Sequence, residues 1–128
     1  MKILLVEDHP DILELYQEML DELGHTYKAF SNAVGIEETI SSYKPDLLML
    51  DIILPVRDGM ELMTDLLRKD IRLPILVISS SREYAETGVF FGASHYLLKP
   101  FSTDSLGYAI DDCIKNYQDI KRGTKNEL

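Results

Sequence analysis

Four apolar residues and one carboxylate form the stretch LLMLD at residues 47–51. A continuous apolar run of this length is typical of a strand that is buried on both faces, as in a parallel sheet covered by helices. Lys44-Pro45 interrupts the preceding segment, and Asp51 stands where the apolar run ends. The stretch therefore predicts a central strand that carries a carboxylate at its carboxyl end.

Similar runs lie on both sides of this stretch and alternate with helical patterns. Further strands are predicted at residues 3–6, 26–30, 75–78 and 96–98, and helices at about residues 10–23, 34–42, 60–67, 82–91 and 103–117. In the helical segments, apolar residues recur every three or four positions, which is the period of a helix with one buried face. Strands that alternate with helices in this way predict an α/β fold, a three-layer doubly wound (βα)5 sandwich around a five-stranded parallel sheet.

Length and composition suit a single acidic domain. The 128 residues are 45% hydrophobic and carry a net charge of -9. We assign residues 1–120 to one domain and residues 121–128 to a polar C-terminal tail or the start of a linker. The negative charge argues against direct binding to nucleic acid, which relies on clustered Lys and Arg. No apolar run is long enough to span a membrane, no secretory leader opens the chain, and the single Cys113 excludes an internal disulfide, so we expect a soluble cytoplasmic protein.

Polar side chains follow the strong strands at the points where they end. Glu7 and Asp8 follow the first strand, Asp51 ends the third, Ser79 the fourth, and Lys99 the fifth. The carboxyl ends of parallel strands meet at one edge of the sheet, where ligands of α/β folds bind. Crowded carboxylates repel one another, and a bound divalent cation is a common resolution. Oxygen ligands in small number suit Mg²⁺, and Mn²⁺ would fit the same set.

This group of side chains suits the transfer of a phosphoryl group. A carboxylate beside a metal ion can attack phosphorus and form an aspartyl phosphate. Asp51 is the better nucleophile because it ends a rigid central strand, whereas Glu7 and Asp8 lie in a loop and suit metal binding. Lys99 can bind a phosphoryl oxygen as a cation, and the Ser79 hydroxyl can donate to another.

The same residues resemble those of a known family, the receiver domains of two-component response regulators in the chemotaxis-regulator-like superfamily. The resemblance covers the chain from Lys2 to Tyr117. Its motifs are Val6-Glu7-Asp8, the segment from Asp51 through Pro55 to Gly59, Ser79, Gly92 to Leu97, and Lys99-Pro100-Phe101. The resemblance implies a flavodoxin-like sheet with strand order 2-1-3-4-5, for which a receiver is itself a standard example. It also implies a cis peptide bond between Lys99 and Pro100.

The resemblance further implies how the phosphoryl group would be taken up. Asp51 would receive it from a histidine kinase or a phosphotransfer protein. The metal ligands would be Glu7, Asp8, Asp51 and the backbone carbonyl of Ile53, and the phosphoryl oxygens would be bound by Ser79 and Lys99. Such a protein takes part in its own phosphorylation and dephosphorylation and is not a turnover enzyme.

A change of surface is the output that the resemblance implies. Tyr96 would turn inward when the Ser79 hydroxyl moves toward the phosphoryl group. The surface of the fourth helix, fifth strand and fifth helix would then control an effector domain or target protein, or form a phosphorylation-dependent homodimer. Ile53 and Ser81 flank the position of a hydrolytic water, and the apolar Ile53 side chain cannot orient that water. We therefore expect a long-lived phosphoryl group.

Two other functions remain open. A Mg²⁺-dependent phosphohydrolase of the haloacid-dehalogenase type would also use an aspartyl phosphate, but it usually needs a second Asp where this chain has Ile53. A pseudo-receiver would keep the fold and bind a partner without phosphorylation, although the complete acidic set argues against it. Singly, Asp51 could be a capping acid, Lys99 its ion-pair partner, and Tyr96 an ordinary packing residue. The chain could be a free-standing receiver or a piece of a longer regulator cut near residues 121–123.

Overall fold

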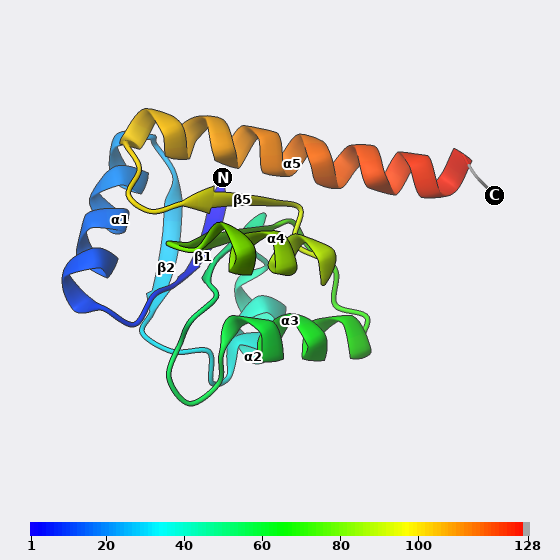
Figure 1. Ribbon diagram of the computed structural model, residues 1–128, viewed down its shortest axis with the longest axis horizontal. Helices are drawn as coiled ribbons and strands as arrows, with labels where there is room; N and C mark the ends of the chain where they lie inside the picture. The colour runs from blue at the N-terminus through cyan, green and yellow to red at the C-terminus, as the bar shows by residue number, and fades with distance from the viewer. Residues whose placement is uncertain (127–128) are drawn as a thin grey trace.

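A parallel five-stranded sheet forms the centre of the computed structural model, which describes residues 1–126 (Figure 1). The strands are β1 (Lys2–Val6), β2 (Thr26–Phe30), β3 (Leu47–Asp51), β4 (Ile75–Ser79) and β5 (His95–Leu98). Their order in the sheet is β2-β1-β3-β4-β5. The structure thus confirms the doubly wound α/β fold and the strand order 2-1-3-4-5.

Helices cover both faces of the sheet. They are α1 (Pro10–Glu22), α2 (Ile36–Tyr43), α3 (Gly59–Arg68), α4 (Arg82–Phe90) and α5 (Thr103–Asn126). Helices α1 and α5 lie on one face, and α2, α3 and α4 lie on the other (Figure 1). No helix within residues 1–126 has an apolar stretch long enough to cross a membrane.

The central strands supply side chains to two separate cores. Along β3, Leu48 and Leu50 belong to the core under α2 and α3, whereas Leu47 and Met49 belong to the core under α1 and α5. All four are fully buried. Successive side chains of a strand point to opposite faces, so a strand covered on both sides must be apolar at every position. This is the physical reason for the LLML run.

Two helix boundaries differ from the predicted ones. Helix α2 begins at Ile36 and not near Val34, because Gly35 adopts a left-handed φ of 75° that interrupts the helical backbone, and Val34 is exposed. Helix α5 continues across the expected domain boundary at residue 120 as far as Asn126. Residues 127–128, the end of the predicted tail, lie outside the described residues.

The loop from residue 52 to residue 58 packs tightly against the end of β3. A Cβ atom at Gly59 would lie 2.7 Å from the Asp51 carbonyl oxygen, so no larger residue fits there without a shift of the backbone. The Gly59 N–H donates to the Ile52 carbonyl at 2.8 Å. Asp58 then caps α3 by accepting a hydrogen bond from the Glu61 N–H at 2.9 Å. Together these contacts bring the start of α3 close to Asp51.

Candidate functional site

A cleft lies at the edge of the sheet where the carboxyl ends of the strands meet. It is lined by Glu7, Asp8, His9, Ile12, Asp51, Ile53, Ser79, Ser80 and Lys99. The structure therefore brings together the predicted metal ligands, the predicted phosphoacceptor and the two predicted phosphoryl-binding side chains. Each is carried there by the end of a strand or by the residues just after it, as expected for a doubly wound sheet.

Three carboxylates form the centre of this cleft, and we call Glu7, Asp8 and Asp51 the acidic cluster. One oxygen of each lies within 4.8 Å of the others, which is close enough for all three to hold one metal ion. Glu7 and Asp51 are 2% and 4% exposed, whereas Asp8 is exposed to solvent. The cluster therefore combines two fixed, buried acids with one that faces the cleft.

Lys99 is a base that bridges two of these acids. Its Nζ donates to Asp51 Oδ2 at 2.5 Å and to Glu7 Oε2 at 3.3 Å. The Lys99 N–H donates to the Ser79 carbonyl at 2.9 Å, and the peptide bond to Pro100 is cis. The ends of β4 and β5 thus place one ammonium group beside two carboxylates.

Backbone N–H groups hold the second carboxylate oxygens of Asp51 and Glu7 and the hydroxyl of Ser79. Asp51 Oδ1 accepts a hydrogen bond from the Ile53 N–H at 2.9 Å, and Glu7 Oε1 accepts one from the His9 N–H at 3.2 Å. The Ser79 hydroxyl is buried and accepts from the Ser81 N–H at 3.0 Å. Because each of these contacts spans two residues, the local backbone alone orients the carboxylates and the hydroxyl toward the cleft.

Burial and a neighbouring carboxylate change the protonation of Glu7. Burial raises the pKa of Glu7 to about 7, and the hydrogen bond and negative charge of Asp51 add to this rise. The His9 N–H and the Lys99 ammonium oppose it without cancelling it. For Lys99, burial lowers the pKa, but the hydrogen bond and charge of Asp51 outweigh burial and leave that pKa raised. The Lys99 ammonium group therefore does not offset the burial of Glu7.

Tyr16 is a neighbour of the site that the sequence did not reveal. It is 4% exposed, and its ring stacks on that of Phe101 at 5.1 Å between centroids. Burial raises the pKa of Tyr16, and the negative charges of Glu7 and Asp51 raise it further. Nothing in the spacing of α1 distinguishes a core tyrosine near the acids from one far from them.

The predicted switch residue Tyr96 lies outside the residues that line the cleft. Its hydroxyl oxygen accepts a hydrogen bond from the Arg82 guanidinium at 3.5 Å, and its ring stacks on His95. Ile53 does line the cleft, and its side chain is 57% exposed. The surroundings of a hydrolytic water would therefore be apolar on the Ile53 side.

The donor set of the acidic cluster fits a hard divalent cation. It offers carboxylate oxygens, which such ions prefer, and a bound cation would favour the charged form of Glu7, whose pKa is raised by burial and by the neighbouring Asp51. The remaining side chains of the cleft, a hydroxyl and an ammonium, suit the oxygens of an anionic group bound beside the metal.

Comparison with known proteins identifies the family. The family of the response regulator receiver domain matches residues 3–111. The chain belongs to this family. Receiver domains take part in two-component signalling as phosphoacceptors, and the receiver is 33% identical over 115 residues to the chemotaxis protein CheY of Halobacterium salinarum, covering 88% of this chain and 96% of that protein.

Longer regulators match over only part of their length. The receiver is 34% identical over 103 residues to the alkaline phosphatase synthesis transcriptional regulatory protein PhoP of Bacillus subtilis, which covers 79% of this chain and 43% of that protein. Among solved structures, the BeF3-activated N-terminal receiver domain of Klebsiella pneumoniae RstA is 33% identical with a TM-score of 0.80, over 89% of this chain and 98% of that one. Relatives therefore include both proteins of this length and regulators about twice as long.

Proposed function

We propose that Asp51 is the phosphoacceptor of this receiver and that a histidine kinase or phosphotransfer protein is the donor. The observation that carries the proposal is the setting of the Asp51 carboxylate, with Oδ1 held by the Ile53 N–H and Oδ2 by Lys99 at the centre of the acidic cluster. In the transfer, an Asp51 oxygen bonds to phosphorus, and the bond between phosphorus and the donor's imidazole nitrogen breaks.

Glu7, Asp8, Asp51 and the backbone carbonyl of Ile53 are the proposed ligands of Mg²⁺, and Mn²⁺ would fit the same ligands. The bound ion would neutralise charge on the phosphoryl oxygens. Lys99 already lies within hydrogen-bonding distance of Asp51, so it can follow a phosphoryl oxygen with little movement. The buried Ser79 hydroxyl lines the same cleft and can donate to a second oxygen.

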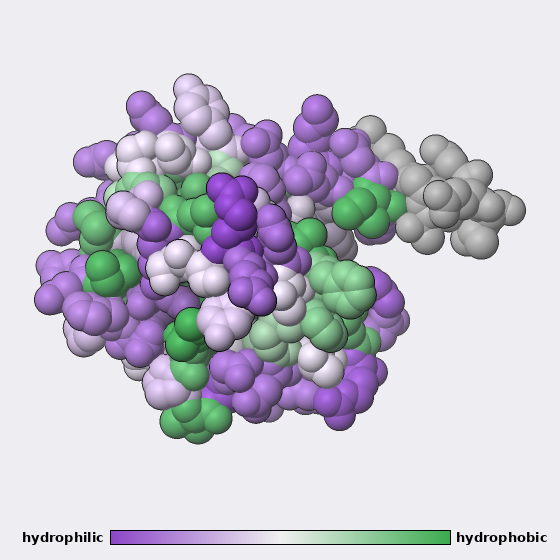
Figure 2. Space-filling model, viewed as in Figure 1, coloured by the Kyte–Doolittle hydropathy of each residue, from purple (hydrophilic) through white to green (hydrophobic). Residues whose placement is uncertain are grey.

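The proposed output is a change of the surface formed by α4, β5 and α5. Movement of the Ser79 hydroxyl toward the phosphoryl group would leave space that Tyr96 can enter. Apolar side chains gather over the carboxyl end of α4 (Figure 2), where Phe90 and Phe91 are 84% and 41% exposed. This surface would contact an effector domain, a target protein or a second copy of the chain, with residues 121–128 as a tail or the start of a linker.

A long lifetime of the phosphoryl group is part of the proposal. Ile53 lines the cleft with an exposed aliphatic side chain that offers neither a donor nor an acceptor. A water that attacks the aspartyl phosphate would therefore lack an orienting group on this side.

Acetyl phosphate and Mg²⁺ test the proposal directly, with the intact mass of the protein as the readout. The unsubstituted protein should gain the mass of one phosphoryl group, and Asp51→Asn should gain none. Asp112→Asn, which changes an exposed acid on α5, is the matched control and should behave like the unsubstituted protein.

Each of the other outcomes points to a different function. An adduct on none of the proteins would favour a pseudo-receiver, and an adduct on Asp51→Asn would place the phosphoacceptor elsewhere. Release of many phosphate ions per chain from small phosphate esters would favour a phosphohydrolase.

A further inference from the structure

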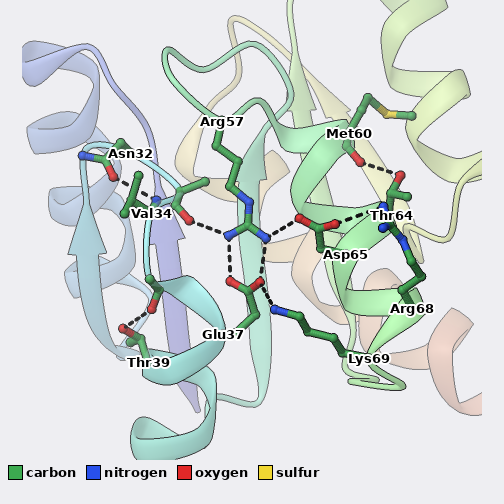
Figure 3. A network of polar contacts seen from close by, with 12 residues as sticks. Asn32, Val34, Glu37, Thr39, Arg57, Met60, Thr64, Asp65, Arg68 and Lys69 are labelled. Carbon is green, nitrogen blue, oxygen red and sulfur yellow. Dashed lines mark hydrogen bonds and ion pairs between the residues drawn. The ribbon is translucent and has the colours of Figure 1, made fainter.

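A second charged cluster includes a residue of the loop that follows Asp51 (Figure 3). We call Glu37, Arg57, Asp65 and Lys69 the Arg57 cluster. Arg57 lies in the loop between β3 and α3, Glu37 lies in α2, and Asp65 lies in α3. Lys69 is the residue that caps the carboxyl end of α3. The cluster thus joins one loop to two helices.

The guanidinium of Arg57 is bound on several sides. Nη1 and Nη2 donate to the two carboxylate oxygens of Glu37, each at 2.6 Å. Nη2 also donates to Asp65 Oδ2 at 2.7 Å, and Nη1 donates to the Ala33 carbonyl at 3.0 Å. Lys69 Nζ donates to Glu37 Oε2 at 2.9 Å. The paired contact with Glu37 fixes the direction of the guanidinium as well as its position.

The two central side chains of the cluster, Arg57 and Glu37, are shielded from solvent. The side chains of Arg57 and Glu37 are 17% and 13% exposed, whereas Arg72 and its partner Asp70 form an ion pair with 65% and 79% exposure. Ion pairs between exposed side chains hold their geometry weakly, and shielded bidentate pairs hold it more firmly. Arg57 is therefore suited to fix the backbone that carries it.

That backbone is strained at the residue before Arg57. Val56 has a φ of 67°, a left-handed value that β-branched residues rarely adopt. The Arg57 N–H donates to the Pro55 carbonyl at 2.7 Å and closes a three-residue γ-turn around Val56, a rare form when the central φ is positive. The Val56 side chain is 87% exposed, so its own packing contributes little to this conformation. A contact outside the turn must hold it.

The same loop borders the acidic cluster at its other end. The Ile53 N–H is bound to Asp51 Oδ1, and Leu54 is 7% exposed in the core under α2 and α3. Beyond Leu54, the γ-turn directs the chain back toward Gly59, whose N–H is bound to the Ile52 carbonyl. The position of the Ile53 backbone thus depends on the conformation of this loop. Arg57 anchors the other end of the loop.

We propose that Arg57 is a positioning residue for the metal site. Through the Arg57 cluster it holds the loop of residues 52–58 in the conformation that places the Ile53 backbone against the acidic cluster, and in this way it sets the affinity for Mg²⁺. The inference rests on the proposed binding of Mg²⁺ by this receiver.

Electrostatics and positioning predict opposite results when the charge of Arg57 is removed. Loss of a positive charge from a protein that binds a cation should by itself strengthen binding of that cation. Loss of the anchor should let the Ile53 backbone move and weaken binding. Changes in residues that support metal ligands typically lower metal affinity by roughly tenfold or more. The sign of the change therefore separates the two effects.

The first measurement is the dissociation constant of Mg²⁺ by calorimetric titration of the unphosphorylated protein. We expect Arg57→Met to raise this constant roughly tenfold, as for other supporting residues of metal sites. Arg57→Lys keeps the charge but not the bidentate contact, so it should give an intermediate value. Arg72→Met is the matched control because it removes the same charge from an exposed ion pair, and its value should stay within about twofold of the unsubstituted protein.

The second measurement is hydrogen exchange of the backbone amides of Ile53, Leu54, Val56 and Arg57 without metal, at a temperature where every variant is folded. Arg57→Met should speed their exchange relative to the amides of β1 and β3, whereas Arg72→Met should leave it unchanged. A purely structural role would lower the unfolding free energy of Arg57→Met without changing Mg²⁺ affinity in the folded protein.

The outcomes distinguish this inference from the proposed function. Equal or tighter Mg²⁺ binding by Arg57→Met overturns the inference and leaves the proposed function intact. Absence of Mg²⁺ binding by the unsubstituted protein overturns both. If Arg57→Met does not fold, Arg57→Lys replaces it, because this variant keeps the positive charge and loses only the bidentate contact with Glu37. Weaker Mg²⁺ binding by Arg57→Lys supports the inference, and unchanged binding overturns it.

Discussion

The two charged clusters connected by the loop after β3 use the same kinds of side chain in opposite balance. The acidic cluster sets three carboxylates against the single ammonium group of Lys99. The Arg57 cluster sets two carboxylates against Arg57 and Lys69, and Arg68 also pairs with Asp65 at 3.2 Å. The first raises the pKa of Glu7 to about 7, mainly by burial, and the second lowers the pKa of Glu37 to about 2, mainly through the hydrogen bonds from Arg57.

This difference separates a binding site from a structural contact. A bound cation stabilises buried carboxylates whose charge the protein does not balance. Without the cation, these carboxylates lower the stability of the fold. Carboxylates whose charge is already balanced gain little from another ion, and they fix the backbone instead. The Glu7 side chain is 2% exposed and burial is the largest cause of its raised pKa, whereas the Glu37 side chain is 13% exposed and hydrogen bonds from Arg57 dominate there. Burial and the balance of charges together therefore make the distinction.

The largest expected effect that tests this contrast concerns Glu7 in metal-free protein. Its pKa in the folded state is about 7, above the ordinary value of 4.5. The protonated carboxyl therefore stabilises the fold fully below pH 4.5, and this contribution is lost as the pH rises toward 7. We expect a loss of about 2 to 3 kcal/mol over this range.

Urea unfolding in EDTA between pH 4.5 and pH 7 measures this effect against Glu7→Gln, which should lack it. Parallel pH profiles for the two proteins would show that the pKa of Glu7 is not raised in the folded protein, and the contrast between the clusters would be lost.

The next effect has the opposite pH dependence and concerns Glu37. Its pKa in the folded state is about 2, below the ordinary value of 4.5, because Arg57 stabilises the charged form. This contribution is present above pH 4.5 and is lost as the pH falls toward 2. With allowance for solvent screening around Lys69, which is 57% exposed, we expect about 1 to 2 kcal/mol.

Acid unfolding of the unsubstituted protein and of Glu37→Gln checks this second prediction. The variant should be less stable near neutral pH, and the difference should shrink between pH 4.5 and 2. A constant difference over this range would mean that the Arg57 cluster does not hold Glu37 in its charged form.

The smallest effect compares the two exposed aliphatic residues of the loop, one at each cluster. Ile53 lines the cleft, whereas Val56 lies in the turn beside Arg57. We expect Ile53→Asn to speed loss of the phosphoryl group about threefold, equivalent to about 0.7 kcal/mol, because an amide can orient the attacking water. Val56→Asn makes the same chemical change outside the cleft and should leave the rate unchanged.

Phosphate release after removal of acetyl phosphate measures these rates at neutral pH. The unsubstituted protein should keep its phosphoryl group for longer than seconds. A lifetime of seconds or less would contradict the role given to Ile53, and so would equal rates for the Ile53→Asn and unsubstituted proteins.

Much of the fold and site followed from local patterns in the chain. The LLML run had to be a strand buried on both faces, because no other common element is apolar at every position and so short. The positions of Asp51, Ser79 and Lys99 at strand ends then placed them in one cleft, since the carboxyl ends of parallel strands converge. The ends of the helices were predicted less well. The start of α2, for example, depends on the left-handed backbone of a single glycine, Gly35.

The Arg57 cluster could not be predicted in this way. Glu37 and Asp65 lie 20 and 8 residues from Arg57 along the chain and on two different helices. No periodic spacing connects these positions, so the sequence offered no reason to pair them. The proximity of Tyr16 to the acids was hidden for the same reason, because its spacing fits any buried position on α1.

The sequence by itself thus determined the fold, the family resemblance and the membership of the acidic cluster, because strand periodicity and strand-end positions are local properties. Only the tertiary structure decided how the charges are balanced. Burial and the approach of distant side chains make Glu7 a weak acid and Glu37 a strong one, although both are ordinary glutamates in the sequence. Those two quantities depend on how α2, α3 and β5 pack around the loop after Asp51, and packing is not a local property.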